Sequence, residues 1–366
     1  MLEFLFNNPF LGTLVVLLWI SLILYAFSAF WWLFEVFGLS WGWKGSQNTD
    51  RWEAEDIQVR ILTIGAENVV QATVNSVPDS IRDIQVIAEK DITITGAEVH
   101  VVPEEFECAA TNKGRAVEWA RQNVPCNREY VLYLDEDTLM TGFEGIPDAD
   151  VVQFSEKPIY TGSRLAYLCE VFRVGYQFEQ LGFHRLRYPL YAWGGGVAIR
   201  HEIEDEITWD VSTITEDTNF IWRAAESRDL TYRLVDARFR NQAPPSVKSL
   251  IKQRRRWISG TLRDGGLLPV SYRPLYYTRI IACFFALCPD LGTVCVSVSG
   301  DSTVNGTVRD DFDRIADDSV CVHIRRDCRI PKTPSVVANL IVLNPSCGPD
   351  SLNWCTLGTV PTNRDV

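Results

Sequence analysis

The sequence predicts an α/β fold with a mostly parallel sheet wound by helices, behind an N-terminal transmembrane helix. Short β-rich runs alternate with segments of helical character over residues 57–265, a pattern typical of such sheets. The apolar run at 130–134 leads into three consecutive carboxylates, as a buried strand would at its tip. A long apolar stretch precedes the whole region.

That stretch, residues 9–39, is almost uninterrupted, and Glu35 is its only charge. About 20 apolar residues cross a bilayer, so we expect a transmembrane anchor. A basic leader and a small-residue cleavage site are lacking, which argues against a signal peptide. Lys44 and Arg51 follow the stretch and only Glu3 precedes it, so the positive-inside rule predicts a membrane protein whose bulk faces the cytoplasm. A buried hairpin of a soluble protein is the alternative.

Composition limits the partners and the compartment. The chain has 366 residues, and 46% of them are hydrophobic, which is ample for a packed core. A net charge of −12 argues against a nucleic-acid partner, which normally requires a basic face. Seven of the ten cysteines lie at or after Cys283, and Cys108, Cys126 and Cys169 are too sparse for a disulfide framework. The main domain is therefore expected in a reducing compartment.

The remaining elements follow in order. Residues 40–56 are expected to form a linker, and residues 57–265 the α/β domain. Strands are predicted at 58–64, 84–89, 97–103, 130–134 and 150–154, and helices most clearly at 112–124 and near 162–182.

The acidic triplet after the strand at 130–134 is the first candidate site. Charge is costly inside a buried strand, so Asp135, Glu136 and Asp137 should lie where the strand leaves the sheet. Ligands bind at the carboxyl ends of strands in open α/β sheets. Carboxylate oxygens there can hold Mg²⁺ or Mn²⁺ against a diphosphate. A solvated acidic turn is an equally weighted alternative.

Three further motifs are ambiguous when each is taken alone. The glycines at 194–196, after Trp193, either let a ligand approach the backbone or form a flexible loop. Thr215, before Glu216 and Asp217, fits a helix cap. Residues 253–257 read Gln-Arg-Arg-Arg-Trp, which is either a surface patch or a pair of guanidinium forks for a diphosphate beside an indole for a sugar ring.

Together the motifs resemble a family. An acidic D-x-D, a T-E-D about eighty residues later and then Q-x-x-R-W form the ordered signature of family 2 glycosyltransferases of the cellulose synthase and hyaluronan synthase type. The resemblance covers roughly residues 57–265 and implies a GT-A nucleotide-sugar-binding fold. The context looks closest to egghead-type β-1,4-mannosyltransferases, through VRILT at 59–63, VVPEE at 101–105, YLDEDTL at 133–139, FRV at 172–174 and Q-R-x-R-W at 253–257.

The resemblance implies roles for individual residues. Asp217 matches the general base and Glu216 its neighbour, and Asp135 and Asp137 match the motif that binds Mg²⁺ or Mn²⁺ and the donor diphosphate. The expected donor contacts are Lys113, Asp135, Gln253, Arg254 and Arg256; the expected acceptor contacts are Trp257 together with Trp193, Gly194 and Gly195. Glu89 stands where many relatives carry an Asp that contacts the nucleotide base. The nucleotide of the donor, GDP or UDP, is therefore left open.

The implied activity is an inverting transfer of a sugar from a nucleotide-diphosphate donor, GDP-mannose or a UDP-hexose, to a lipid-linked or glycan acceptor with a β-linkage. One convincing membrane span argues against a channel within this chain, so we expect the addition of one or a few sugars. Residues 266–288 read as an interfacial or truncated membrane segment. Residues 289–366 form an atypical Cys-rich tail, for which a disordered segment and a reading frame lost near 283–290 are the two hypotheses.

Two rival functions stay open at this point. A haloacid-dehalogenase-type phosphatase also places D-x-D after an apolar strand, but it needs Thr or Val two positions beyond the second Asp, where this chain has Leu139. A non-catalytic membrane protein is the other rival. Metal-dependent release of a nucleotide diphosphate would separate the transferase from both.

Overall fold

The computed structural model describes residues 9–43 and 51–282. The predictions for part of the linker and for the chain after residue 282, including the Cys-rich tail and the lost reading frame, lie outside the described residues. The N-terminal apolar stretch forms the helix α2 (Pro9–Phe34), which continues as the π-helical turn η1 (Glu35–Leu39). Within the described ranges, one helix, Phe10–Leu39, is both long enough and apolar enough to cross a membrane; this criterion uses length and composition.

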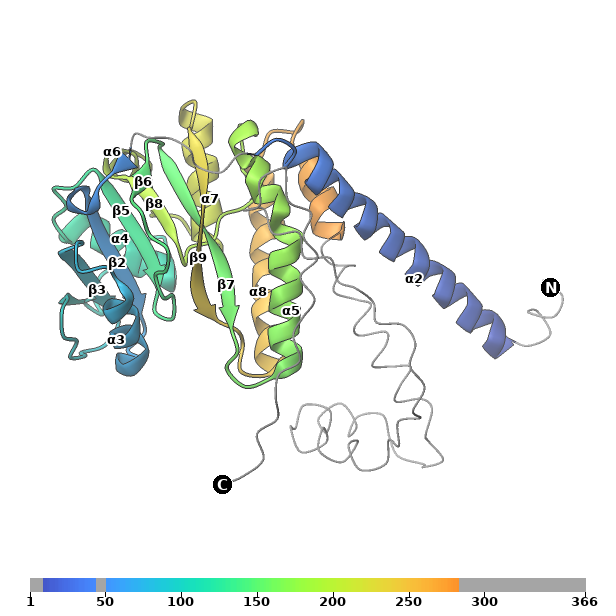
Figure 1. Cartoon of the computed structure of the whole chain (residues 1–366), viewed down its shortest axis with the longest axis horizontal. Helices are drawn as coiled ribbons and strands as arrows, with labels where there is room; N and C mark the ends of the chain where they lie inside the picture. The colour runs from blue at the N-terminus through green and yellow to red at the C-terminus, as the bar shows by residue number, and fades with distance from the viewer. Residues whose placement is uncertain (1–8, 44–50, 283–366) are drawn as a thin grey trace, which may run out of the picture. The chain divides into compact units, whose positions relative to one another are not determined.

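A seven-stranded sheet is the centre of the α/β domain (Figure 1), with strand order β4-β3-β2-β5-β8-β7-β9. Its strands are β2 (Ile57–Thr63), β3 (Asp83–Ala88), β4 (Glu98–Val101), β5 (Tyr130–Asp135), β7 (Val151–Ile159), β8 (Val197–Arg200) and β9 (Tyr232–Gln242). Within this sheet β8 pairs antiparallel with β5 and β7, and all other pairs are parallel. The predicted wound, mostly parallel sheet is therefore confirmed.

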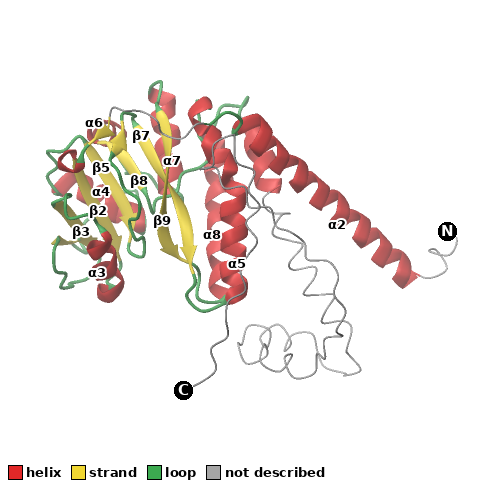
Figure 2. Ribbon diagram, in the orientation of Figure 1, coloured by secondary structure: helices red, strands yellow, loops and turns green. Residues whose placement is uncertain are grey.

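Helices cover both faces of the sheet (Figure 2), which explains why β2 and β5 read as continuous apolar runs. The helix α3 (Glu67–Ser76) contributes Val70 and Val74 to the core on one face. The other core takes side chains from three helices, among them Val117, Ile203 and Phe220. These helices are α4 (Lys113–Asn123), α6 (His201–Ile207) and α7 (Glu216–Ser227).

Two further helices, α5 (Arg164–Gly175) and α8 (Val247–Asp264), run side by side next to β7 and β9 (Figure 1). The helix α8 begins at Ser246, whose hydroxyl accepts a hydrogen bond from the Ser249 N–H and so satisfies one free donor of the first turn. The short elements are the strand pair β1 (Arg51–Trp52) and β6 (Ile146–Pro147), the 3₁₀ segments η2 (Ala54–Asp56), η3 (Tyr176–Arg185) and η4 (Gly265–Leu267), and a helical stretch at 273–282.

The predicted strands lie at β2, β3, β4, β5 and β7, with ends that differ by a few residues. The predicted helix at 112–124 is α4, whereas the one near 162–182 is divided into α5 and η3. Among the described residues, Cys108, Cys126 and Cys169 form no disulfide.

Candidate active site

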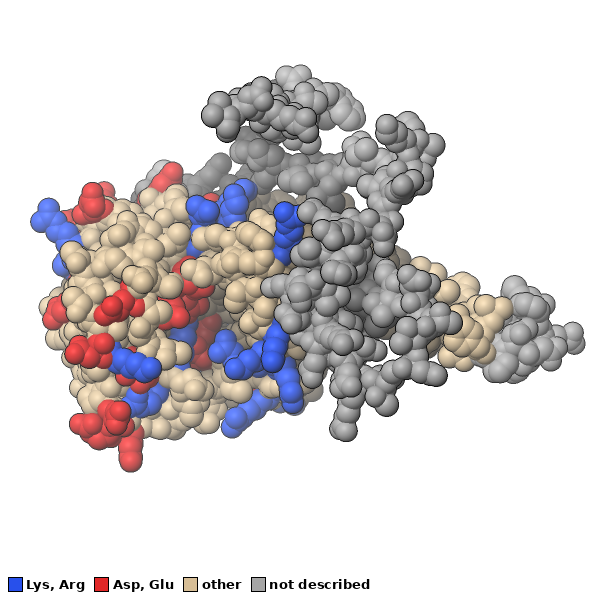
Figure 3. Space-filling model, turned by 90° about the horizontal axis from the view of Figure 1, so that it is seen from below, with Lys and Arg blue, Asp and Glu red and all other residues tan. Residues whose placement is uncertain are grey.

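A cavity of about 360 Å³ opens where the parallel strands end, and its size is in the range of sites for small molecules. Figure 3 views the chain from this side and shows a hollow with acidic residues on one flank and Lys and Arg on the other. The cavity is lined by eleven of the residues selected from the sequence: Lys113, Asp135, Asp137, Trp193, Gly194, Glu216, Asp217, Gln253, Arg254, Arg256 and Trp257. The structure thus brings together motifs that lie more than 100 residues apart in the sequence.

The acidic triplet divides between two surroundings, because β5 ends at Asp135 and the chain turns at Glu136 and Asp137. Asp135 and Asp137 line the cavity. Glu136 turns to the loop after β2, where its carboxylate accepts a 2.6 Å hydrogen bond from the Thr63 hydroxyl. The carboxylate of Asp137 accepts from the backbone N–H of Gln242, at the end of β9, at 3.3 Å. Two of the three carboxylates are therefore available to a ligand.

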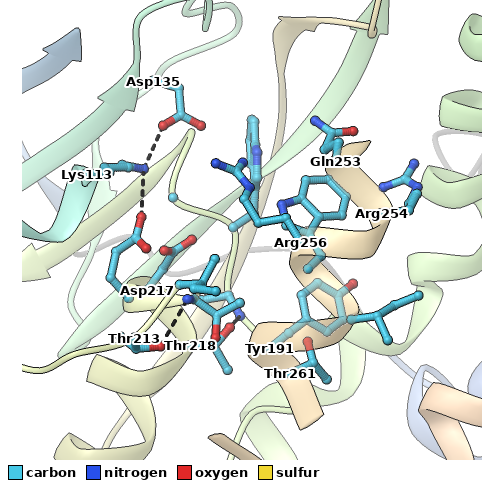
Figure 4. Close-up of a pocket in the computed structure, with 18 of the residues that line it drawn as sticks. Lys113, Asp135, Tyr191, Thr213, Asp217, Thr218, Gln253, Arg254, Arg256 and Thr261 are labelled. Atoms are coloured by element: carbon cyan, nitrogen blue, oxygen red, sulfur yellow. Dashed lines mark hydrogen bonds and ion pairs between the residues drawn. The ribbon is translucent and has the colours of Figure 1, made fainter. Parts of the chain in front are cut away.

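Lys113, the first residue of α4, connects the first and second motifs. Its ammonium nitrogen donates to Asp135 Oδ1 at 2.6 Å and lies 3.8 Å from Glu216 Oε1 (Figure 4). Burial alone would lower the pKa of Lys113, but the charges of Asp135, Asp217 and Glu216 raise it above its ordinary value. Lys113 therefore stays positively charged within the acidic wall of the cavity.

Glu216 and Asp217 form the first turn of α7, and both line the cavity. Burial, with the charge of Asp217 next, raises the pKa of Glu216 to about 8. Thr215 occupies the cap position, but its side chain makes no capping hydrogen bond. Its hydroxyl and that of Thr213 donate to Asp264 at the end of α8, so the threonines fix the turn that presents the two acids.

The loop before β8 places its backbone close to the charged cluster. The buried Gln153 side chain on β7 accepts from Trp193 N and donates to Trp193 O, both at 2.9 Å. A Cβ atom at Gly194 would lie 2.5 Å from Lys113 Nζ and 2.8 Å from Asp217 Oδ2. The absence of a side chain at Gly194 is therefore required for the observed approach of loop and cluster.

The third motif faces the first two across the cavity. In Figure 4, Asp135, Lys113 and Asp217 lie on one side, and Gln253, Arg254 and Arg256 extend from α8 on the other.

Arg254 differs from the role implied by the family resemblance. Its Nη2 donates to the Glu170 carboxylate, while Nε and Nη1 are buried without a hydrogen-bond partner. Burial, with the charge of Arg173 next, lowers the pKa of Arg254 to about 10.

Two of the expected contacts lie outside the lining of the cavity. The carboxylate of Glu89, which was expected to contact the nucleotide base, accepts a 2.9 Å hydrogen bond from Arg115. Gly195 is covered by the ring of Trp193, which would lie 2.5 Å from a Cβ atom there. Neither residue lines the cavity in this conformation, and their contacts with donor and acceptor stay predictions.

Further lining residues were not selected from the sequence: Thr111, Asn112, Glu170, Arg173, Tyr191, Ala192, Thr213, Ile214, Thr215, Thr218, Asn241, Gln242, Ile258, Thr261, Arg279 and Ile280. Arg173 was within reach of sequence reasoning, because it is the middle residue of the FRV segment that contributes to the family resemblance.

A divalent cation fits at Asp135 and Asp137. Burial, with the charge of Asp135 next, raises the pKa of Asp137 to about 6, and a cation would relieve this repulsion. Among the described residues, no group of three or more His, Cys, Asp and Glu side chains could hold a metal ion. Two carboxylates suffice for Mg²⁺ or Mn²⁺ when substrate phosphates and water complete the coordination.

A wound sheet, an acidic strand tip and a helix that carries arginines surround one cavity. This arrangement defines a glycosyltransferase of the GT-A fold, and enzymes of this class use nucleotide sugars. The chain belongs to this class by sequence as well: the family model "Glycosyl transferase family group 2" matches residues 130–312, and the protein is a member of that family. The match favours the transferase over the phosphatase alternative. No curated protein matches the chain.

One solved structure supports the fold, and two further structures are similar at lower scores. A mannosyltransferase from Pyrobaculum calidifontis, in complex with GDP-Man and Mn²⁺, is similar with a TM-score of 0.52 and 13% identity, over 77% of this chain and 87% of that one. Glucosyl-3-phosphoglycerate synthase from Mycobacterium tuberculosis, in complex with phosphoglyceric acid, follows at 0.39 and 16%, over 61% and 88%. Mannosyl-3-phosphoglycerate synthase from Rubrobacter xylanophilus follows at 0.35 and 17%, over 58% and 76%.

Proposed function

We propose that the protein is a membrane-anchored, inverting hexosyltransferase that moves a sugar from GDP-mannose or a UDP-hexose to a lipid-linked or glycan acceptor, forming a β-linkage. The convergence of Asp135, Asp137, Asp217 and Arg256 on one cavity carries this proposal. Asp135 and Asp137 belong to the D-x-D motif, Asp217 to T-E-D and Arg256 to Q-x-x-R-W. A family 2 transferase needs all three motifs around one sugar diphosphate.

In the proposed reaction Asp217 takes the proton of the acceptor hydroxyl, and the hydroxyl oxygen attacks the anomeric carbon. The bond from that carbon to the diphosphate breaks as the new bond forms, so the anomeric centre inverts. A positioned general base contributes typically about 10²–10⁴ in rate. Lys113 lies 3.8 Å from Glu216 and 2.6 Å from Asp135, which places a fixed positive charge between the base and the donor side.

The leaving diphosphate is stabilised in this proposal by a metal site and by an arginine. Asp135 and Asp137 would hold Mg²⁺ or Mn²⁺, which neutralises charge on the departing oxygens when it is bound. Arg256 extends from α8 toward the same cavity and supplies a guanidinium that needs no proton transfer. Arg254 donates to Glu170 instead, so the proposal assigns the diphosphate to Arg256 and not to Arg254.

The proposed donor follows from the family resemblance, and the proposed acceptor from the apolar N-terminal helix. The egghead-type resemblance favours GDP-mannose, and the mannosyltransferase with a similar fold was solved with GDP-Man and Mn²⁺. The apolar helix that ends at Leu39 favours a lipid-linked acceptor at the cytoplasmic membrane face. Product sizing tests the acceptor proposal, because long polymer from purified protein would contradict addition of one or a few sugars.

The deciding experiment measures release of nucleotide diphosphate from GDP-mannose and from UDP-hexoses, with and without Mn²⁺. We expect metal-dependent release with one donor, and transfer that Asp217→Asn abolishes while donor binding stays within about threefold of wild type. Simultaneous loss of donor binding would reassign Asp217 to the donor site. Absence of release with every donor would favour the non-catalytic alternative.

A further inference from the structure

Four side chains of alternating charge form a row, and three of them line the cavity. Arg173, on α5, donates from both terminal guanidinium nitrogens to the Glu156 carboxylate on β7, with Nη2 to Oε2 at 2.7 Å. Its Nε donates to Glu170 Oε2 at 2.7 Å. The other oxygen of Glu170 accepts from Nη2 of Arg254, on α8. We call Glu156, Arg173, Glu170 and Arg254 the charge row; it joins the neighbouring elements β7 and α5 to α8, where Arg254 lies 84 positions from Glu170.

The charge row is desolvated and electrically balanced. The side chains of Glu156 and Glu170 are 2% and 3% exposed, and those of both arginines are 13% exposed. Two carboxylates and two guanidinium groups cancel each other, and the shared oxygens of Glu170 link the two arginines. Removal of one partner would leave a buried charge without its counter-charge, which is strongly destabilising. The four groups therefore hold one another in place.

The charge row borders Trp257. The guanidinium carbon of Arg254 lies 4.6 Å from the centre of the indole ring, and that of Arg173 lies 5.5 Å from it. Guanidinium groups at such distances attract the face of an aromatic ring. Glu170, both arginines and Trp257 all line the cavity. The position of the ring on the wall therefore depends on the two guanidinium groups that Glu170 holds together.

We propose that Glu170 and Arg173 are positioning residues for acceptor binding: they fix the ring of Trp257 on the cavity wall by holding two guanidinium groups against it. This inference rests on the proposed function, which places Trp257 on the acceptor side. Asp135 and Asp137, the proposed metal ligands, have no hydrogen bond with the charge row among the described residues. Glu170 should therefore affect use of the acceptor and leave donor binding nearly intact.

The test replaces Glu170 by Gln, which keeps the shape of the side chain and removes the charge. We expect kcat/KM for the acceptor to fall about 10–100-fold, because small displacements of a positioning group are costly, while the donor dissociation constant stays within about threefold. The matched control is Glu206→Gln, which breaks a 2.8 Å ion pair with Arg228 away from the cavity and should leave both constants within about threefold. Equal losses in donor and acceptor constants would overturn the proposal.

A double-mutant cycle with Trp257→Ala separates positioning from a general structural effect. If Glu170 acts through the indole ring, Glu170→Gln adds less than about a threefold loss of kcat/KM in the Trp257→Ala background. Losses that multiply would overturn the positioning role. If Glu170→Gln does not yield folded protein, Arg173→Lys replaces it in the same cycle, since it keeps the charge but loses the fork. Wild-type protein that transfers no sugar would refute the proposed function itself, whereas active wild type with multiplied losses refutes only this inference.

Discussion

A single methyl group at Gly194 should disable the site without unfolding the protein. In Gly194→Ala the new Cβ atom would lie 2.5 Å from Lys113 Nζ and 2.8 Å from Asp217 Oδ2, whereas ordinary contacts begin near 3.4 Å. Lys113 must then move by about 0.9 Å and Asp217 by about 0.6 Å. Misplacement of a reacting group by about 1 Å can cost ~10²-fold in rate. We therefore expect kcat/KM to fall about 10²-fold.

The assay is sugar transfer by purified Gly194→Ala at saturating donor, with thermal unfolding measured in parallel. The clashing atoms are the ends of side chains, so the melting temperature should stay close to that of the wild type. Gly266→Ala is the matched control, because a Cβ atom there meets nothing within 4 Å. Activity of Gly194→Ala within about threefold of wild type would refute the close approach of the loop to Lys113 and Asp217.

Three further predictions concern charge. The folded-state pKa of Glu216, about 8 against an ordinary 4.5, favours its protonated form, so its contribution to stability is present at low pH and is lost as the pH rises through about 8. Glu216→Gln should thus gain stability relative to wild type between about pH 4.5 and pH 8, and unfolding midpoints at both ends of that range would show it. Glu204→Gln should destabilise the fold by about 3–5 kcal/mol in urea unfolding, because the fully buried Arg60 would keep its charge and lose its counter-charge; an unchanged midpoint would contradict this. Asp137→Asn should bind the donor equally well with and without Mn²⁺, whereas the wild type should bind it more tightly with the metal. Calorimetry measures both affinities. If the variant keeps the metal dependence, Asp137 is not a ligand of the metal.

Local physical chemistry was sufficient to predict the centre of the fold. The strand β5 is an apolar run, and the cost of burying charge requires that it end at the triplet beginning with Asp135. The central strands are buried on both faces, so their composition alone identified them. The antiparallel β8 and the edge strand β9 were not predicted, because β8 has four residues and β9 carries charged side chains at four of its eleven positions.

The site was predicted to the extent that each residue belongs to a motif. Contacts between motifs could not be predicted, because they depend on packing of elements distant in sequence. The ion pair of Arg254 with Glu170 joins residues 84 positions apart, and nothing local to either marks the other. Glu89 is a second example. Its place after β3 suggested a contact with the nucleotide base, and nothing in the sequence around it indicated the 2.9 Å hydrogen bond that it accepts from Arg115 on α4.

The reversed strand β8 has a consequence for how such enzymes can diversify. It pairs with β5 over only four positions, from Tyr130 opposite Arg200 to Tyr133 opposite Val197. The carboxylates of the D-x-D lie on one side of this seam, and the helix with the arginines and Trp257 belongs to chain that comes after it. A chimaera that exchanges residues 201–265 with those of a relative would therefore replace Asp217, Arg256 and Trp257 as one block while it retains its own D-x-D. Recombination at this seam lets evolution exchange the base and the arginine helix together, without disturbing the carboxylates at the tip of β5.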